Sequence, residues 1–299
     1  VHGNTPKASL LSMLAAKLTR VPVRVYMCHG LRYQGFDGGV RKLLMAMERL
    51  SCTCATEVLC VSRGVRDTLI RDHVCKESKC KVVHNGSANG IDLSLFNPDR
   101  IDGRKVREEL RIQENEFVFV FVGRIVRDKG VNELVAAFDK LYETYPSMAL
   151  ILVGPEEDEL NPISQETQRI IERHPKIYAV GRKNDVKPYM RIANVFVLPS
   201  YREGFGMVLM EAGALGVPCI TTDISGCNEI VVDNENGLII PPKDEASLYE
   251  VMRYAVEHPD EMKWMGKNAR SLVEERYEQR VVWEALLGEY QRLLEGEVE

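Results

Sequence analysis

The sequence lacks any apolar run long enough to cross a bilayer. A spanning helix needs ~20 consecutive apolar residues, and no apolar run in these 299 residues approaches that length. The eight cysteines form no Cys-x-x-Cys pair of the kind that indicates zinc or redox chemistry; Cys52 is followed by Cys54, and Cys75 by Cys80. No signal-peptide pattern opens the given sequence, so we expect a cytoplasmic protein whose reduced thiols fill its core and whose membrane contact is peripheral.

Two further patterns are missing. No Asp-x-Asp pair follows a predicted strand, so the sequence offers no metal ligand set. Aromatic residues make up only 7% of the chain, and its early basic residues interleave with apolar rather than aromatic ones, which favours an anionic lipid surface over nucleic acid. Ordinary solvated helix faces explain these charges equally well. They are Lys7, Lys17, Arg20, Arg24, Arg32, Arg41 and Lys42.

Charge is distributed unevenly along the chain. Residues 1–100 hold 15 Lys and Arg against 8 Asp and Glu, a net charge of +7, whereas residues 101–299 hold 24 against 36, a net charge of −12. A basic first part beside an acidic second part predicts an anionic acceptor or surface as the partner of the first.

Strands and helices alternate over most of the chain, which predicts α/β domains with parallel sheets. The length suits two small domains of this kind. Apolar runs predict strands near 23–28, 57–61, 117–122, 149–155, 176–182, 193–198 and 218–222, with a short one within 236–244. Helices are expected near 9–19, 40–54, 65–72, 131–145, 206–216 and 274–294, with Ser62 capping the third.

The most informative segment is Pro199–Ala212. It follows a predicted buried strand and leads into a helix, with two glycines, Gly204 and Gly206, at the helix start. Backbone N–H groups at such a start suit a phosphate or another anionic oxygen. Glu203 and Glu211 flank the glycines, and carboxylates accept hydrogen bonds from sugar hydroxyls. The segment therefore favours a phosphate with a sugar on either side, which is the shape of a nucleotide-sugar.

A second loop supplies positive charge. The strand near 117–122 ends in Gly123 and Arg124, and Lys129 precedes Gly130 and a predicted helix. Ligands of open α/β sheets bind in the crevice at such βα loops. Arg124 offers a planar fork for a diphosphate and Lys129 a compact point charge.

Together these segments resemble the donor site of retaining GT-B glycosyltransferases of family 4 (glycosyltransferase group 1), in particular members that build bacterial surface polysaccharides. The resemblance covers almost the whole chain and implies two Rossmann-like doubly wound domains facing a cleft. It places an acceptor-binding domain at residues 1–98, a linker at 99–115, a nucleotide-sugar domain at 116–280 and a helix crossing back to the first domain at 281–299. It also implies further strands before Val1, including a Gly-rich first loop, so the first domain is expected to be incomplete.

The resemblance further implies a cytoplasmic, metal-independent enzyme without a cofactor, which moves a hexosyl or N-acetylhexosaminyl group with retention from a UDP-sugar. Arg124 and Lys129 are expected to hold the diphosphate, Glu203 the donor sugar and Glu211 the ribose. The acceptor is expected to be a saccharide or a polyprenyl-linked saccharide, with contact at the inner membrane surface. The donor-binding set is Gly123, Arg124, Lys129, Gly204, Phe205, Gly206, Met207, Val208 and Glu211.

The acceptor side is predicted less sharply. Asn4, Lys7 and His29 lie on βα loops of the first domain, where the resemblance places the acceptor, and Asn4 stands where many relatives carry a titratable His. His2 is interpreted as a buried, hydrogen-bonded structural histidine, with its role left open. Two alternatives stay open: a nucleotide-sugar epimerase or phosphorylase of the same fold, and a non-catalytic nucleotide-sugar-binding protein.

Overall fold

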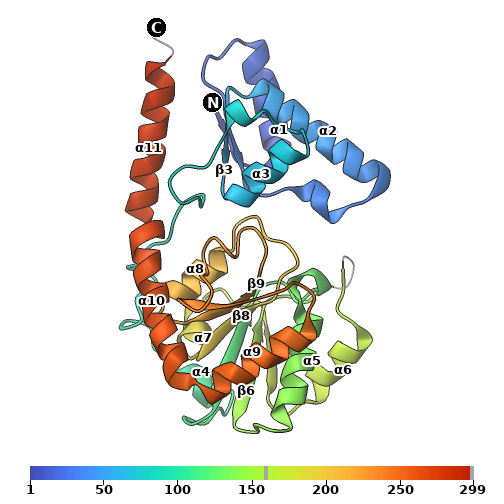
Figure 1. Cartoon of the computed structure of the whole chain (residues 1–299), viewed down its shortest axis with the longest axis vertical. Coiled ribbons are helices and arrows are strands. Elements are labelled where there is room, and N and C mark those ends of the chain that lie inside the picture. The colour runs from blue at the N-terminus through green and yellow to red at the C-terminus, as the bar shows by residue number, and fades with distance from the viewer. Residues whose placement is uncertain (158–160, 297–299) are drawn as a thin grey trace. The chain divides into compact units, whose positions relative to one another are not determined.

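The computed structural model describes residues 1–157 and 161–296 (Figure 1). These residues form two compact units. Unit 1 consists of residues 1–90 together with the C-terminal segment from Arg276, and unit 2 consists of Ile91–Glu275. Each unit is built on its own parallel sheet, so the α/β class predicted from the alternation of elements is confirmed.

Unit 1 holds a four-stranded sheet in the order β1-β2-β3-β4. All four residues of β2 are buried, as expected for a parallel strand covered on both faces. The hydroxyl of Ser62 accepts a hydrogen bond from the Val65 N–H at 3.1 Å, which confirms the predicted helix cap. The strands are β1 (His2–Gly3), β2 (Val25–Cys28), β3 (Glu57–Cys60) and β4 (Cys80–Lys81); the helices are α1 (Pro6–Leu18), η1 (Arg32–Gly35), α2 (Gly38–Cys54), α3 (Arg63–Arg71) and η2 (Glu77–Lys79).

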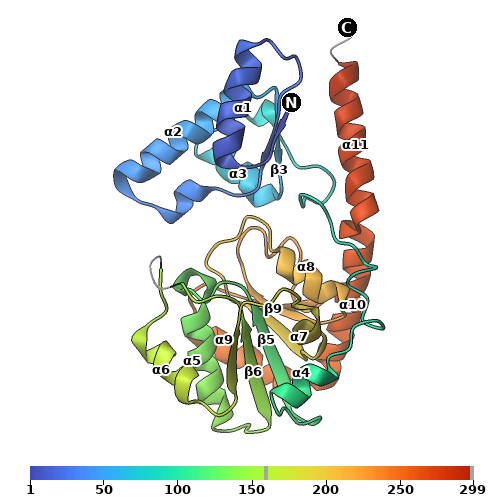
Figure 2. The same ribbon diagram turned by 180° about the vertical axis from the view of Figure 1, so that it is seen from behind.

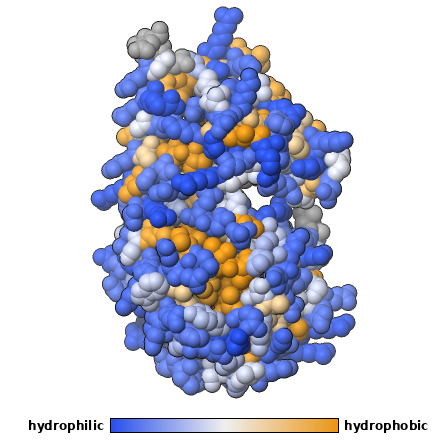
Figure 3. All heavy atoms as spheres, viewed as in Figure 1, coloured by the Kyte–Doolittle hydropathy of each residue, from blue (hydrophilic) through white to orange (hydrophobic). Residues whose placement is uncertain are grey.

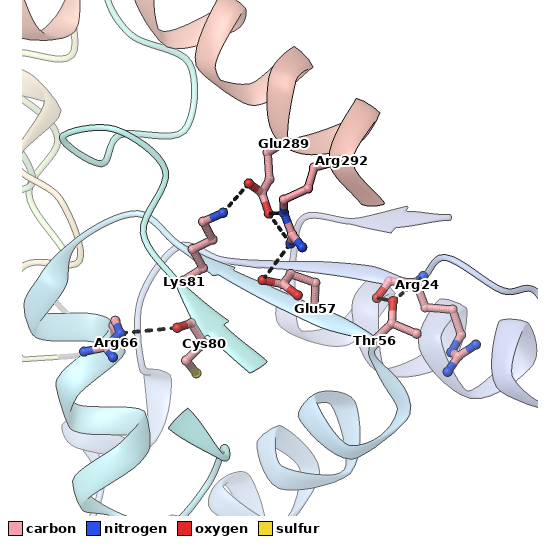
Figure 4. Close-up of polar contacts among 8 residues, drawn as sticks. All are labelled: Arg24, Thr56, Glu57, Arg66, Cys80, Lys81, Glu289 and Arg292. Atoms are coloured by element: carbon pink, nitrogen blue, oxygen red, sulfur yellow. Dashed lines mark hydrogen bonds and ion pairs between the residues drawn. The ribbon is translucent and has the colours of Figure 1, made fainter. Parts of the chain in front are cut away.

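The C-terminal helix α11 (Gln279–Glu295) belongs to unit 1 although it follows unit 2 in the sequence. It lies on the opposite side of the sheet from α1 and α2 (Figure 2). Polar contacts hold it there: buried Glu289 accepts from Lys81 of β4 and pairs with Arg292, which in turn reaches Glu57 of β3 at 3.5 Å (Figure 4).

The sequence predicts one helix over 274–294, but the structure has two. Helix α10 (Pro259–Tyr277) ends one residue before Glu278, which leaves helical geometry at ψ 138°. The Glu278 carboxylate accepts from the N–H groups of Arg280 and Val281 and thereby caps α11. Because apolar periodicity continues on both sides of this cap, hydropathy alone did not reveal the break.

Unit 2 holds a six-stranded parallel sheet in the order β10-β9-β8-β5-β6-β7. Every residue of β5 and of β6 is buried, and these two strands form the centre of the core. The strands are β5 (Phe117–Val122), β6 (Met148–Val153), β7 (Ile177–Gly181), β8 (Val195–Leu198), β9 (Cys219–Thr222) and β10 (Gly237–Ile240). The helices are α4 (Arg104–Glu109), η3 (Arg127–Lys129), α5 (Val131–Tyr142), α6 (Gln165–Arg173), α7 (Lys187–Arg191), α8 (Met207–Ala214), α9 (Glu245–Glu257) and α10.

The direction of chain growth reverses within this sheet. From β5 the chain adds β6 and β7 on one side, and it then returns to add β8, β9 and β10 on the other side of β5. The carboxyl ends of β5 and β8 therefore meet at a topological switch point, where ligands of doubly wound sheets bind.

The surface is mainly hydrophilic, with apolar side chains gathered in patches on both units (Figure 3). All eight cysteines are buried and free of disulfide bonds, as predicted. Among residues 1–157 and 161–296, no helix combines the length and the apolar character that a membrane span requires.

Candidate active site

The candidate active site of unit 2 lies at the switch point between β5 and β8. The loop after β5 carries Arg124 and Lys129, and the loop after β8 carries Glu203 and leads into α8. The structure brings Lys129 and Glu203 together as a half-buried ion pair, with side chains 19% and 14% exposed. The Ser200 hydroxyl also donates to the Glu203 carboxylate at 2.8 Å. These two contacts to its carboxylate orient Glu203, and the ion pair holds Lys129 at the carboxyl edge of the sheet.

Gly130 fixes the path of the first loop. It takes a left-handed conformation with φ 72°, which glycine adopts without the steric cost of a Cβ. A Cβ at this position would lie 2.0 Å from the carbonyl oxygen of Pro199, in the loop after β8. The two loops can approach this closely only because residue 130 has no side chain.

Further contacts tie the same two loops together. The Tyr201 N–H donates to the Asp128 carbonyl at 2.9 Å, and the Arg202 guanidinium pairs with the Asp128 carboxylate at 2.7 Å. The Tyr201 hydroxyl donates to Glu133, in the first turn of α5, at 2.5 Å. Burial and this bond raise the pKa of Tyr201, so the phenol stays protonated and continues to donate. Lys129 and Glu203 thus sit on loops that are locked to each other.

Helix α8 begins at the same edge of the sheet. Its N-cap residue Gly206 donates from its N–H to the Gly226 carbonyl at 2.8 Å, which fixes the start of the helix against the segment after β9. Gly204, Phe205, Met207 and Val208 are partly exposed around this start. A helix start with glycines and a positive dipole end is suited to an anion.

Glu211 lies in the second turn of α8, on the same element that the glycine loop opens. Burial raises its pKa to about 7, and the positive charge of Lys187, at the start of α7, opposes that rise. A carboxyl that titrates near neutrality can accept hydrogen bonds from hydroxyl groups when it is ionised.

Arg124 is placed differently from Lys129. Its side chain is half exposed, and its guanidinium pairs with Glu157, in the loop after β6, rather than with Glu203. Gly123 precedes it at the end of β5 and is partly exposed. Each of the two basic residues therefore has a carboxylate partner within unit 2.

The predicted acceptor-side residues belong to unit 1. Asn4 follows β1 and His29 follows β2, so both lie at the carboxyl edge of that sheet, and Lys7 lies in the first turn of α1; all three are exposed. Partial desolvation of its ring by the surrounding loop nonetheless lowers the pKa of His29. The interpretation of His2 as buried is wrong: the residue is exposed, although its Nδ1 is hydrogen-bonded to the Tyr290 hydroxyl of α11 at 2.9 Å.

Two family descriptions match the chain over consecutive stretches. "Glycosyl transferases group 1" matches residues 102–272, and "Glycosyltransferase Family 4" matches residues 1–88. The first match alone covers more than half of the chain and contains the whole candidate site of unit 2. The chain is a group 1 glycosyltransferase.

Relatives with assigned roles support this membership. The glycosyltransferase is 32% identical to the capsular polysaccharide biosynthesis glycosyltransferase CapM of Staphylococcus aureus, over 98% of this chain and 77% of the relative. It is 27% identical, over 91% of this chain and 70% of the relative, to the Escherichia coli UDP-Gal:alpha-D-GlcNAc-diphosphoundecaprenol alpha-1,3-galactosyltransferase.

Solved structures establish the fold. Anabaena Alr3699/HepE in complex with UDP superimposes with a TM-score of 0.84 at 22% identity, over 97% of this chain and 78% of that one. Sucrose-phosphate synthase from Thermosynechococcus elongatus gives a TM-score of 0.79 at 26% identity, over 99% of this chain and 73% of that one. The glycosyltransferase has the GT-B fold, as predicted.

Several residues of the site were not foreseen from the sequence of this glycosyltransferase. Asp128, Tyr201 and Arg202 join the two loops, Glu157 pairs with Arg124, and Lys187 acts on Glu211. Asp128, Tyr201 and Arg202 adjoin predicted residues, so adjacency was the available signal. Glu157, in the loop after β6, and Lys187, at the start of α7, come from other segments of the chain, and no sequence signal marked them.

Proposed function

We propose that the enzyme transfers a hexosyl or N-acetylhexosaminyl group from a UDP-sugar to a saccharide acceptor, with retention of anomeric configuration. The observation that carries this proposal is the charge pattern at the switch point of unit 2: two cations, Arg124 and Lys129, beside a glycine-rich helix start, with Glu203 and Glu211 on either side. Cations and a helix start suit a diphosphate. The carboxylates suit the hydroxyls of a sugar and of a ribose.

In this proposal, each residue has one task. Arg124 and Lys129 exchange their carboxylate partners for the diphosphate and stabilise the negative charge that develops on the leaving group. Glu203 and the backbone of Gly204–Gly206 orient the donor sugar, and Glu211 accepts from the ribose hydroxyls. The departing phosphate oxygen helps to take the proton of the acceptor hydroxyl on the same face of the sugar, which gives retention.

The basic residues and the α8 start supply the positive charge that a metal ion would otherwise supply, so we propose that transfer proceeds without a metal or another cofactor. Transfer that survives excess EDTA supports this view, and a strict need for Mg²⁺ or Mn²⁺ contradicts it.

We propose a lipid-linked saccharide of surface-polysaccharide synthesis as the acceptor, reached at the cytoplasmic face of an anionic membrane. Two relatives, from Escherichia coli and Campylobacter jejuni, carry names with a diphospho-undecaprenol acceptor. Unit 1 exposes apolar side chains next to exposed basic ones, a combination typical of peripheral lipid contact. The apolar residues are Leu11, Leu18, Phe36, Val40, Leu43 and Leu50; the basic ones are Lys7, Lys17, Arg20, Arg32, Arg41 and Lys42. Arg24 is excluded, because its guanidinium donates to the carbonyls of Cys54 and Pro22.

The test is transfer from radiolabelled UDP-sugars to a bacterial membrane extract, with NMR of the product linkage. We expect labelled lipid-linked saccharide, free UDP and the same anomeric configuration in donor and product. Isomerised UDP-sugar without transfer would instead indicate an epimerase. UDP binding without any change in the donor would indicate a binding protein.

A further inference from the structure

Two residues of different kinds hold the carboxylate of Glu203. Its Oε1 atom pairs with the Lys129 ammonium and also accepts a hydrogen bond from the Ser200 hydroxyl at 2.8 Å. Among the residues that the structure describes, none donates a hydrogen bond to the other oxygen, Oε2. The two partners therefore converge on one oxygen and leave the second one for a ligand hydroxyl.

Lys129 and Ser200 differ in what else they can bind. The Lys129 side chain is partly exposed, and its ammonium is a compact charge with three donors on a flexible stem, so it can turn toward an anion. Ser200 is fully buried, and its hydroxyl has a single proton to donate, which Glu203 accepts. A ligand can therefore draw Lys129 away from Glu203, but it cannot reach Ser200.

The backbone of Ser200 is fixed on both sides. Its carbonyl accepts a hydrogen bond from the hydroxyl of Thr222, the last residue of β9, at 2.6 Å. The next peptide N–H, that of Tyr201, donates to the Asp128 carbonyl in the loop after β5 at 2.9 Å. A side chain on such a backbone keeps its place when a ligand enters, which is what a residue that orients another one requires.

We propose that Ser200 is a positioning residue, which keeps Glu203 in place after the donor diphosphate has drawn Lys129 away. This inference rests on the proposed function, in which Lys129 exchanges Glu203 for the diphosphate and Glu203 binds the donor sugar. The Ser200 hydroxyl continues to donate to Oε1 while Oε2 accepts from a sugar hydroxyl. Ser200 itself touches neither nucleotide nor sugar and acts through Glu203 alone.

The Ser200 hydroxyl matters because the Glu203 side chain is mostly buried. A carboxylate in such surroundings is poorly hydrated, and leaving one of its oxygens without a donor is unfavourable. Without the Ser200 hydroxyl, the departure of Lys129 would leave Oε1 in that condition, and the side chain would turn toward solvent and away from the sugar. UDP has no donor sugar, so its affinity does not depend on where Glu203 points.

The experiment compares the native full chain with Ser200→Ala in two measurements. Calorimetry gives the Kd of UDP. Radiolabel transfer to a fixed amount of bacterial membrane extract gives kcat/KM for UDP-glucose, UDP-galactose, UDP-N-acetylglucosamine and UDP-N-acetylgalactosamine. For the sugar that the native chain transfers, Ser200→Ala should lower kcat/KM about 10- to 100-fold, the scale of one hydrogen bond to a charged group. The Kd of UDP should change less than about twofold. Ser200→Thr retains a hydroxyl and should recover most of the lost transfer.

Thr221→Val is the matched control. Thr221 is as fully buried as Ser200, but its hydroxyl donates to the Leu198 carbonyl at 2.9 Å and not to Glu203, so this variant should keep native transfer. A double variant tests the route of the effect: Ser200→Ala combined with Glu203→Ala should bind the UDP-sugar no more weakly than Glu203→Ala alone. Thermal unfolding checks that each variant folds. If Ser200→Thr does not fold, the comparison of Ser200→Ala with Thr221→Val decides.

The outcomes separate this role from the proposed function. Native transfer by Ser200→Ala, an equal loss in Thr221→Val, weaker UDP binding by Ser200→Ala, or an additional loss in the double variant would overturn the positioning role while the native chain still transfers sugar. A native chain that transfers none of the four sugars would contradict the proposed function itself, and the role of Ser200 with it.

Discussion

The two units use different means to hold their shape. Unit 2 is organised around strands of six fully buried residues, and its functional loops meet through a backbone approach that admits no side chain at residue 130. Unit 1 has strands of two to four residues, relies on polar contacts to hold α11, and holds six of the eight cysteines. Leu18 is 81% exposed on unit 1. The comparison teaches that internal packing specifies the candidate site of unit 2, whereas most of the large apolar side chains exposed among the described residues belong to unit 1.

The largest expected difference between the units comes from replacing one left-handed glycine in each unit by alanine. Gly130→Ala should lower the free energy of unfolding by about 4 kcal/mol, since strain of about 1–2 kcal/mol adds to a clash with the Pro199 carbonyl. Gly38→Ala is the matched control: φ is 61°, yet no atom lies within 4 Å of its added Cβ, so only the strain of about 1–2 kcal/mol remains. Urea unfolding of both variants measures the difference. Equal losses would show that the close approach of the two loops is not needed.

A second prediction concerns the cations of unit 2. Arg124→Ala and Lys129→Ala should each weaken UDP binding by about 1.5–3 kcal/mol, the range for hydrogen bonds to charged groups. Isothermal calorimetry measures the change. Arg173→Ala serves as control, because Arg173 is an exposed arginine at the end of α6, which leads into the amino end of β7. Unchanged UDP affinity in both site variants would contradict the assignment of diphosphate binding to this loop.

The next largest effect concerns the stability that the polar contacts of α11 give to unit 1. Glu289→Ala leaves Lys81 and Arg292 without their buried partner and should cost about 1–2 kcal/mol of unfolding free energy. Glu250→Ala removes an exposed pair with Arg253 of α9 and should cost at most about 0.5 kcal/mol. Thermal unfolding of the two variants compares them. If Glu289→Ala lowered the free energy of unfolding no more than Glu250→Ala does, α11 would be held by its apolar face alone.

The smallest expected effects separate Glu203 from Glu211. Glu211→Gln should weaken UDP by about 1 kcal/mol at pH 8, as expected for one lost hydrogen bond to a ribose hydroxyl. Glu203→Gln should leave UDP affinity unchanged and reduce transfer. The reverse pattern would exchange the two roles.

Glu211 also predicts that stability and UDP affinity depend on pH. Its pKa rises from the ordinary 4.5 to about 7 on folding, so the folded chain holds this proton more tightly than the unfolded chain. The stability it contributes is complete below pH 4.5 and is lost as pH rises toward 7. UDP affinity should change in the opposite direction and increase through pH 7, because the ionised carboxylate is the better acceptor. UDP affinity measured from pH 6 to 8 for the native chain and for Glu211→Gln tests this pH dependence. Parallel curves for the two chains would contradict the role of Glu211.

Much of this architecture was predictable because buried strands carry their own signal. The apolar run at 117–122 and the glycine signals after it placed Arg124 and Lys129 on one loop, and the segment 199–212 placed Glu203 beside a helix start. What could not be predicted depends on contacts between distant segments. Nothing local in Glu157 distinguishes it as the partner of Arg124, and the break at Glu278 depends on a cap within an unbroken apolar stripe.

The locked loops of unit 2 also bear on the thermodynamics of ligand capture. The Tyr201 N–H donates to the Asp128 carbonyl, and the backbone at Gly130 lies close against the Pro199 carbonyl, so contacts within the chain itself fix both loops. The conformational entropy of these loops is therefore lost during folding and not when a ligand arrives. Heat-capacity changes on binding here should report only the surface that the ligand covers, without the large negative contribution that accompanies loops that fold around their ligand.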